Sequence, residues 1–259
     1  AASAVATAGG TITFEGLLNG GQNLTITAGT GNVTFSGAVG GTARLGTLNI
    51  VSAGNVGAGA LTLGAFAQDA GSGTTTFNGA VNTNTSAGVV VVNTNLAVNA
   101  AVTTTNSGVV TFTQSGTTVI AAAGDIVSDG AVTITSGGGT TTSGDITTTA
   151  DAIQFASATS LGGAVALASA NGAVTFASTL DGAQNLTITA GTGAVAFNGA
   201  VGGSTRLGTL NIVSANNVIA SALTLGAFAQ DAGSGTTTFN GAVNTNTSAG
   251  VVVVNTNLV

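Results

Sequence analysis

Apolar and polar residues alternate in short runs along the whole chain. The runs 24–27, 33–35, 48–50 and 61–63 each place an apolar side chain at every second position, and Gly, Asn, Ser and Ala separate them. A period of two predicts β-strands with one buried face. Because the spacers are short and turn-forming, the pattern predicts an all-β chain of many short strands.

Phenylalanines recur at a spacing of about 21 residues. Such an interval suits one turn of a solenoid, and two or three strands per turn would stack on their counterparts as parallel sheets. The sequence therefore predicts a parallel β-helix, or β-solenoid, of about 20–21 residues per turn and about a dozen turns. Right-handed winding is expected from the bias of parallel crossovers. The predicted column is Phe14, Phe35, Val56 and Phe77, then Phe155, Phe176, Phe197, Val218 and Phe239.

One interval breaks this spacing. Phe77 to Phe112 is about 35 residues, short of two turns, which predicts one shortened or distorted turn. The stretch 82–99 would then be either a local platform or a trimmed corner. Its asparagines are alternatively expected to form side-chain ladders that satisfy backbone groups at turns; they are Asn82, Asn84, Asn93 and Asn95.

A longer repeat overlies the short one. Residues 23–96 return as 185–258 with roughly nine residues in ten unchanged, a period of about 162 residues. We interpret 1–259 as a single continuous solenoid domain, with a long repeat 1–162 and a partial second copy 163–259. Composition does not shift along the chain, and no linker rich in Pro or charge divides it.

Differences between the two copies predict which side chains face outward. Asn32 and Thr34 become Ala194 and Ala196, whereas the intervening Val33 recurs. Alternate change and retention is expected where an exposed face alternates with a buried one. The opening segment follows the same pattern, since Ala4 and Ala6 recur while Ser3, Val5 and Thr7 differ. The same reasoning places those alanines inward there.

Composition limits the chemistry available. The 259 residues contain no Cys, Met, Trp, Tyr, Pro or His, and the two basic residues are both arginines, Arg44 and Arg206. Eight acidic residues give a net charge of −6. Two cations cannot neutralise several phosphates, so we expect no nucleic-acid partner. General acid–base catalysis at neutral pH would have to rest on Asp and Glu alone, so we expect no enzyme and assign no catalytic or cofactor-binding residue.

Only a few residues invite a specific site. Asp125 and Asp145 each sit in a Gly-Asp-Ile motif about 20 residues apart, so their carboxylates could share Ca²⁺ from adjacent turns. Solvated turn aspartates are the alternative that we favour, and no metal ligand is assigned. A salt bridge between Arg44 and Asp69 is plausible across adjacent turns. No apolar run approaches the roughly 20 residues of a membrane-spanning helix.

Outward threonines raise the possibility of ice binding, which needs flat and regular ranks of Thr. The column preceding the phenylalanines is interrupted, and no second Thr file lies beyond it. Ice binding is therefore a minor alternative. The expected column is Thr13, Thr34, Asn55 and Thr76, then Thr111, Thr133, Gln154, Thr175, Ala196, Asn217 and Thr238.

The run 23–41, followed by 45–50, carries a family resemblance. Its sequence, NLTITAGTGNVTFSGAVGG and then LGTLNI, resembles the strand repeats of very large bacterial surface and exported proteins. It is similar in style to filamentous haemagglutinin and autotransporter passenger domains. The resemblance implies a right-handed parallel β-helix, secretion to the bacterial cell surface, and a role in adhesion, sheath or filament formation. It transfers no functional residue.

These observations favour a structural extracellular fibre or surface-protein stalk, serving adhesion, a sheath or a biofilm scaffold. The alternatives are an adhesin stalk that presents a separate binding tip, and a functional amyloid. Neither end of the sequence carries a recognisable solenoid cap, so the expected partners are a continuation of the chain or end-to-end self-association. A cell-surface or extracellular polysaccharide is a further possible partner.

Overall fold

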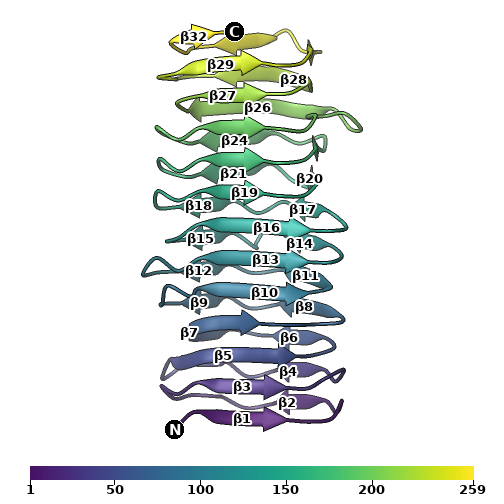
Figure 1. The fold of residues 1–259 in the computed structure, drawn as a ribbon, viewed down its shortest axis with the longest axis vertical. Helices are drawn as coiled ribbons and strands as arrows, with labels where there is room; N and C mark the ends of the chain where they lie inside the picture. The colour runs from purple at the N-terminus through teal and green to yellow at the C-terminus, as the bar shows by residue number, and fades with distance from the viewer. The chain divides into compact units, whose positions relative to one another are not determined.

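The computed structural model describes all 259 residues and contains 32 β-strands and no helix. By its internal contacts the chain divides into two compact units, Ala1–Gly130 with Ser136–Gly138, and Ala131–Thr135 with Gly139–Val259. Each unit is a parallel β-solenoid with about 21 residues per turn, and the chain has about 12 turns in all (Figure 1). The predicted fold class is confirmed.

Three parallel ladders of strands make up the first unit, and each is named here after its first strand. The β1 ladder contains β1 (Ser3–Ala6), β3 (Leu24–Thr27), β5 (Leu45–Ser52), β7 (Leu61–Gln68), β10 (Val89–Asn93) and β13 (Val110–Gln114). The β2 ladder contains β2 (Ile12–Phe14), β4 (Val33–Phe35), β6 (Val56–Ala58), β8 (Thr74–Phe77), β11 (Asn95–Val98) and β14 (Thr118–Ile120). The β9 ladder is preceded by single bridges Leu18–Val39–Leu61 and contains the start of β7, then β9 (Val81–Thr83), β12 (Val102–Thr104) and β15 (Ile126–Ser128).

The second unit is built in the same way. Its β16 ladder contains β16 (Val132–Ser136), β19 (Ile153–Phe155), β22 (Val174–Phe176), β25 (Val195–Phe197), β27 (Val218–Ala220), β29 (Thr236–Phe239) and β32 (Asn257–Leu258). Its β17 ladder contains β17 (Thr140–Thr142), β20 (Thr159–Leu161), β23 (Leu180–Asp181), the start of β28 (Leu223–Gln230) and β30 (Val243–Thr245). Its β18 ladder contains β18 (Ile146–Thr148), β21 (Val165–Ala168), β24 (Leu186–Thr189), β26 (Leu207–Ser214), the end of β28 and β31 (Val251–Val253).

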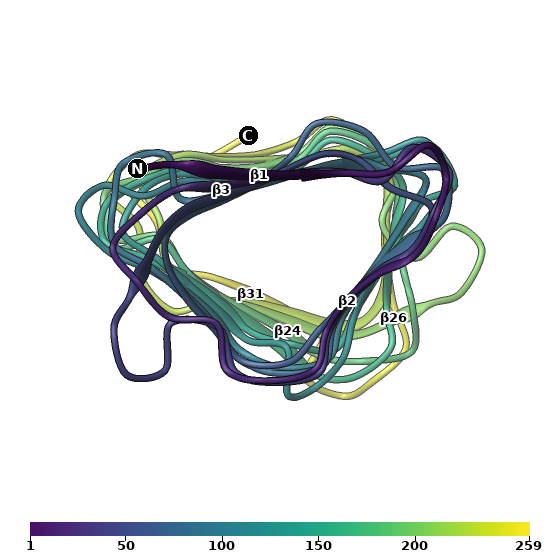
Figure 2. The same cartoon turned by 90° about the horizontal axis from the view of Figure 1, so that it is seen from below.

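The winding is right-handed, as expected. Seen from the N-terminal end, β1 and then β2 follow one another clockwise while the chain recedes from the viewer (Figure 2). Within a unit, the three ladders surround a narrow core that their inward side chains fill. In β4, Val33 and Phe35 are buried and Thr34 between them is half-buried, and β25 has the same pattern. The alternation of buried and outward positions predicted for these strands is confirmed.

Strand register corrects the membership of the phenylalanine column. Phe35 pairs with Ala58, and Ala58 pairs with Phe77, so Ala58 and not Val56 belongs to the column. In the second copy Ala220 likewise takes the place predicted for Val218. The turn before this strand is two residues longer than 21, which moves the register by two while leaving the buried parity unchanged.

The predicted distorted turn after Phe77 is wrong. Phe77 pairs with Val98, and Val98 pairs with Ile120, so the column continues through aliphatic residues at steps of 21 and 22. Phe112 belongs to β13 in the β1 ladder, where it pairs with Val91. The spacing of aromatic residues gave a wrong prediction because Val98 and Ile120 take the inward positions of this column. The stretch 82–99 contains regular strands of all three ladders.

The parity expected for the opening segment is also wrong. Val5 pairs with the buried Ile26, whereas Ala4 pairs with the half-buried Thr25. In the second copy Leu167, which replaces Val5, is 1% exposed. Here the inward position changed between two apolar side chains and the outward alanine did not, so retention does not by itself mark burial.

The long repeat preserves local structure closely. Leu24 pairs with Leu48 and Leu186 with Leu210, and both pairs of strands carry a register shift after the isoleucine, at Ile26 and Ile188. The following step is 18 residues in both copies, from Leu48 to Phe66 and from Leu210 to Phe228. The uneven turns are therefore part of the repeat. That 1–259 forms one continuous domain stays a prediction.

Replacing Phe176 with alanine should weaken the second unit more than any outward substitution in the same strand. Its ring stacks between Phe155 at 4.9 Å and Phe197 at 5.4 Å and is 1% exposed. Removing a buried ring costs about 3–5 kcal/mol. Urea unfolding followed by circular dichroism should show this loss for F176A, and a change below about 0.5 kcal/mol for the outward control T175A. Equal midpoints for the two variants would contradict the assignment of the core face.

Candidate functional site

Asp145, singled out in the sequence, and Asp129 each form a hydrogen bond to the backbone of another turn. Asp145 Oδ1 accepts the Ala166 N–H at 2.7 Å, and Asp129 Oδ2 accepts the Ser107 N–H at 2.8 Å. Asp125 lies in the first unit and Asp145 in the second. No cluster of three or more His, Cys, Asp or Glu side chains able to hold a metal ion occurs in the structure.

Asparagine side chains link successive turns in a consistent way. The Oδ1 atom of Asn23 accepts the Thr47 N–H at 2.8 Å, and Asn95 Oδ1 accepts the Thr117 N–H at 2.9 Å. Asn95 thus satisfies a backbone group of the next turn, as expected, although its side chain bonds to Thr117 and to no other asparagine. The other three differ, because Asn82 receives an arginine, Asn93 donates to the Asn95 carbonyl, and the Asn84 carbonyl accepts Asn106 Nδ2.

The salt bridge between Arg44 and Asp69 does not form. Arg44 Nη1 donates to the Leu63 carbonyl at 2.6 Å and to the Asn82 carbonyl at 3.1 Å, and Nη2 donates to Asn82 Oδ1 at 2.6 Å. Asp69 instead accepts from Asn49 Nδ2 at 3.2 Å. The guanidinium has five N–H donors, so it can reach several carbonyl acceptors at once. Arg44 is therefore a clamp that joins its own turn to the next two.

The loop that carries Arg44 is fixed at both sides. It begins at Gly40, whose φ of 72° is in the left-handed region and where a Cβ would collide with the Thr62 carbonyl. Asn19 Oδ1 in the preceding turn accepts the N–H groups of Thr42 and Ala43 at 2.9 and 3.2 Å. The second copy repeats this arrangement. Asp181 Oδ1 accepts the N–H groups of Ser204 and Thr205, and Arg206 Nη1 donates to the carbonyls of Leu225 and Asn244.

Register also corrects the outward threonine column. Thr34 pairs with Gly57, and Gly57 with Thr76, so Gly57 occupies the position expected for Asn55. In the second copy Ala196 pairs with Ile219 instead of the expected Asn217. Thr76 is then followed by Ala97 and Val119. The rank is interrupted, as the sequence predicts, and such a surface offers no regular threonine array for ice.

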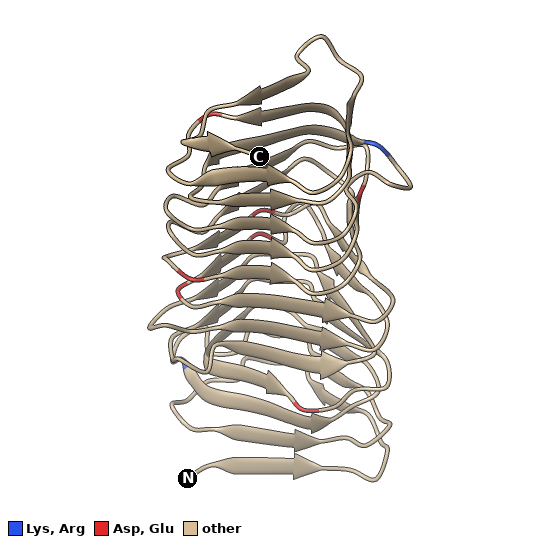
Figure 3. Cartoon of the chain, turned by 45° about the horizontal axis from the view of Figure 1, so that its top comes forward, with Lys and Arg blue, Asp and Glu red and all other residues tan.

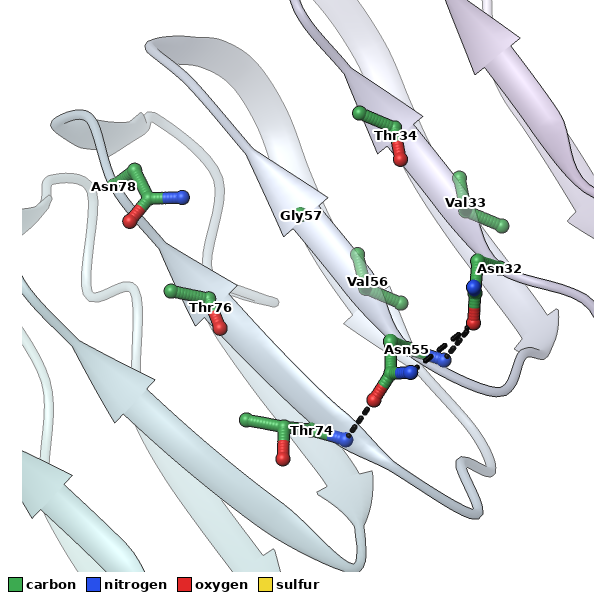
Figure 4. Close-up of a pocket in the computed structure, with 9 residues that line it drawn as sticks. All are labelled: Asn32, Val33, Thr34, Asn55, Val56, Gly57, Thr74, Thr76 and Asn78. Carbon is green, nitrogen blue, oxygen red and sulfur yellow. Dashed lines mark hydrogen bonds between the residues drawn. The ribbon is translucent and has the colours of Figure 1, made fainter.

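A shallow groove of about 280 Å³ follows from this register and lies on the outer face of β4, β6 and β8 (Figure 4). We call it the Gly57 groove. Gly57 forms its floor, and a Cβ added there would meet nothing within 4 Å. The sequence did not predict this groove, because Asn55 was expected at the position between Thr34 and Thr76 that Gly57 occupies. The lining residues are Asn32, Val33, Thr34, Asn55, Val56, Gly57, Thr74, Thr76 and Asn78.

Amide groups order one end of this groove. Asn32 Oδ1 accepts both the backbone N–H of Asn55 at 2.9 Å and its Nδ2 at 3.2 Å, and Asn55 Oδ1 accepts the Thr74 N–H at 2.8 Å (Figure 4). The walls are the side chains of Thr34 and Thr76, one strand to either side of Gly57. No charged side chain lines the groove. Charged residues are few and scattered along the whole chain (Figure 3).

Comparisons with known proteins give no family and no relative. No protein-family model matches the chain, and neither a curated protein nor a solved structure matches it. No helix in the structure has the length and apolarity required to cross a membrane.

Replacing Arg44 with lysine should loosen the loop that it anchors. A single ammonium group cannot span three carbonyl acceptors, so we expect about 1–2 kcal/mol less protection of the backbone amides from Thr42 to Arg44. Hydrogen exchange of R44K would measure it, with the untouched Arg206 loop as internal reference. N19D is the matched control, because the second copy already carries Asp181 there. Unchanged exchange in R44K would refute the clamp.

Proposed function

We propose that this chain is a structural segment of a bacterial extracellular fibre or surface-protein stalk, whose function is to provide length and stiffness. The observation that carries this proposal is the faithful repetition of local structure. The register shift at Ile26 recurs at Ile188, and the arginine clamp of Arg44 recurs at Arg206. A duplication that reproduces the strands, the register shift and the arginine clamp lengthens the solenoid without requiring any new kind of contact.

The chemistry of the surface supports a passive structural role. All ten charged residues together leave a net charge of −6, and Arg44 and Arg206 are both engaged with backbone carbonyls. What the surface mainly presents is hydroxyl, amide and backbone groups. Neutral polar surfaces limit nonspecific electrostatic attraction, which suits a spacer exposed to the medium.

Two routes to extension are compatible with the fold. A strand edge with unpaired N–H and C=O groups accepts another strand in register, from the same chain or from a second copy. Val89 of β10 shows the outcome inside the chain, since it is fully buried once β13 pairs with it through Val110. We propose that covalent tandem copies, or copies stacked end to end, extend the fibre in this way at the bacterial surface after secretion.

Length should rise linearly with copy number. Arrays of one, two and four copies of the 162-residue repeat should gain about 37 Å per copy, at about 21 residues per turn and about 4.8 Å per turn. Electron microscopy or small-angle scattering would measure the increment. The control is an array with Phe35 replaced by aspartate in every copy, which should lose the ordered core. A length that rises as the square root of copy number, as for a flexible chain, would refute a stiff spacer.

A further inference from the structure

Within the segments 23–96 and 185–258, the differences between the two copies are concentrated on one outer surface. Of the 74 aligned positions in 23–96 and 185–258, only eight differ. Six of these eight lie on β4 and β6 or beside them, and their counterparts lie on or beside β25 and β27. The pairs are Asn32/Ala194, Thr34/Ala196, Ser36/Asn198, Gly54/Asn216, Gly57/Ile219 and Gly59/Ser221; Thr42/Ser204 and Ala43/Thr205 in the arginine loop complete the set.

Exposure alone does not explain this concentration. Half-buried or exposed residues such as Thr25, Thr76 and Asn78 recur unchanged as Thr187, Thr238 and Asn240. If every outward position accepted substitutions equally, the differences would be spread over all outward positions of these segments. Within these segments the outer face of β4 and β6 has changed, whereas the outward residues of β3 and β8 have not. Outside them the copies also differ around β2, for example at Thr11/Ala173 and Glu15/Ala177.

The larger outward side chains lie on β4 in the first copy and on β27, the counterpart of β6, in the second copy. In the first copy β4 and its flanks carry Asn32, Thr34 and Ser36, and β6 and its flanks carry three glycines. In the second copy the smaller Ala194 and Ala196 lie just before β25 and at its middle, and Asn198 follows its end, whereas β27 and its flanks carry the larger Asn216, Ile219 and Ser221. We call this second surface the Ile219 ridge, made of Asn216, Ile219 and Ser221.

The two surfaces are therefore complementary in height. The Gly57 groove is low on its middle strand and walled by Thr34 and Thr76. The Ile219 ridge is high on its middle strand and lies between Ala196 and Thr238. Ile219 is 44% exposed, a large apolar side chain that nothing in the chain covers fully. Two β-sheets pack face to face at about 10 Å when their outward side chains interdigitate.

Packing within one copy does not require this arrangement at the central position. A Cβ on Gly57 would have open space, so the fold accepts a side chain there, as Ile219 demonstrates. Gly54 differs, because a Cβ there would meet the Thr30 carbonyl oxygen at 2.5 Å and Asn32 Oδ1 at 3.0 Å, and Asn216 in the second copy is accompanied by the smaller Ala194. Local compensation thus explains the pair Asn32 and Gly54, but not Gly57.

We propose that the Ile219 ridge of one molecule packs into the Gly57 groove of a second copy of this chain, giving lateral association. Neither surface carries a charged side chain, so no charge is desolvated. The polar ends of the ridge, Asn216 and Ser221, face the hydroxyl and amide walls of the groove, which keeps their hydrogen-bonding capacity satisfied. The proposal concerns the faces of the solenoid and does not depend on extension at its strand edges.

Such a contact is heterologous, because one surface meets a different surface on the next molecule. Heterologous contacts propagate unless their rotation closes a ring. One ridge in one groove is smaller than a standard stable interface, so each contact is weak, and longer arrays gain strength from several contacts at once. A net charge of −6 on each chain opposes association, which should therefore strengthen with added salt.

Two converted chains test the proposal. N32A/T34A/G57I gives the first copy the residues of the second at these three positions, and A194N/A196T/N216G/I219G gives the second copy the residues of the first at four. Each uses side chains that the other copy already accommodates, so both should fold, with circular dichroism as the check. V119T is the matched control, because Val119 is also 44% exposed but lies on β14, outside both surfaces.

Sedimentation velocity over a concentration series is the measurement. The natural chain and V119T should associate, and each converted chain alone should lose at least about tenfold in association constant, because a buried Ile is worth that much. Mixing the two converted chains should restore association, since one supplies only ridges and the other only grooves.

Three outcomes would overturn the proposal. In the first, the natural chain stays monomeric at the highest concentration reached. In the second, both converted chains associate as the natural chain does, which would leave stacking at strand edges as the contact. In the third, mixing the two converted chains does not restore association. A neutral glucan that binds the natural chain but not N32A/T34A/G57I, with association unaffected, would instead make the groove a glycan site.

Discussion

The structure depends on the backbone hydrogen bonds between successive turns. Every named strand pair is parallel, so each turn uses the N–H and C=O groups of the turns next to it. These bonds leave little freedom in register, because a slip of one residue would turn every inward side chain outward. Turn length is therefore flexible only where a loop absorbs the excess. The 24-residue step from Leu24 to Leu48 and the 18-residue step that follows illustrate this.

Side chains at the corners extend the same interaction. Asn23 and Asn95 accept backbone N–H groups from the next turn, and Arg44 reaches carbonyls in two further turns. A chain with few charges and no disulfide thus stabilises its loops with side-chain amides, a few carboxylates and one guanidinium in each copy. Aromatic stacking adds to the core where phenylalanines coincide, as in Phe155 and Phe176 at 4.9 Å. Because these hydrogen bonds and ring contacts recur in both copies, the long repeat is a structural module.

The fold class was predictable from sequence because its two periods, of two residues and of about 21, arise directly from pleating and turn length. Register was not. Phenylalanine spacing alone placed Val56 beside Phe35, since it could not show that a longer turn moves Ala58 into that place. The same two-residue error hid the Gly57 groove. The salt bridge of Arg44 failed for another reason: nearby carbonyl oxygens compete with a carboxylate, and no spacing rule reveals them.

The central claim is that register, and with it the outer surface, is fixed by the axial ladder in which Thr34 lies beside Gly57. The chain has no cysteine, so engineered pairs report on this directly. The account predicts that folded T34C/G57C closes a disulfide under mild oxidation, because neighbouring strands bring paired Cα atoms to about 5 Å. T34C/N55C, two residues out of register, should remain reduced under the same conditions. Preferential closure of T34C/N55C would contradict the register and the groove that follows from it.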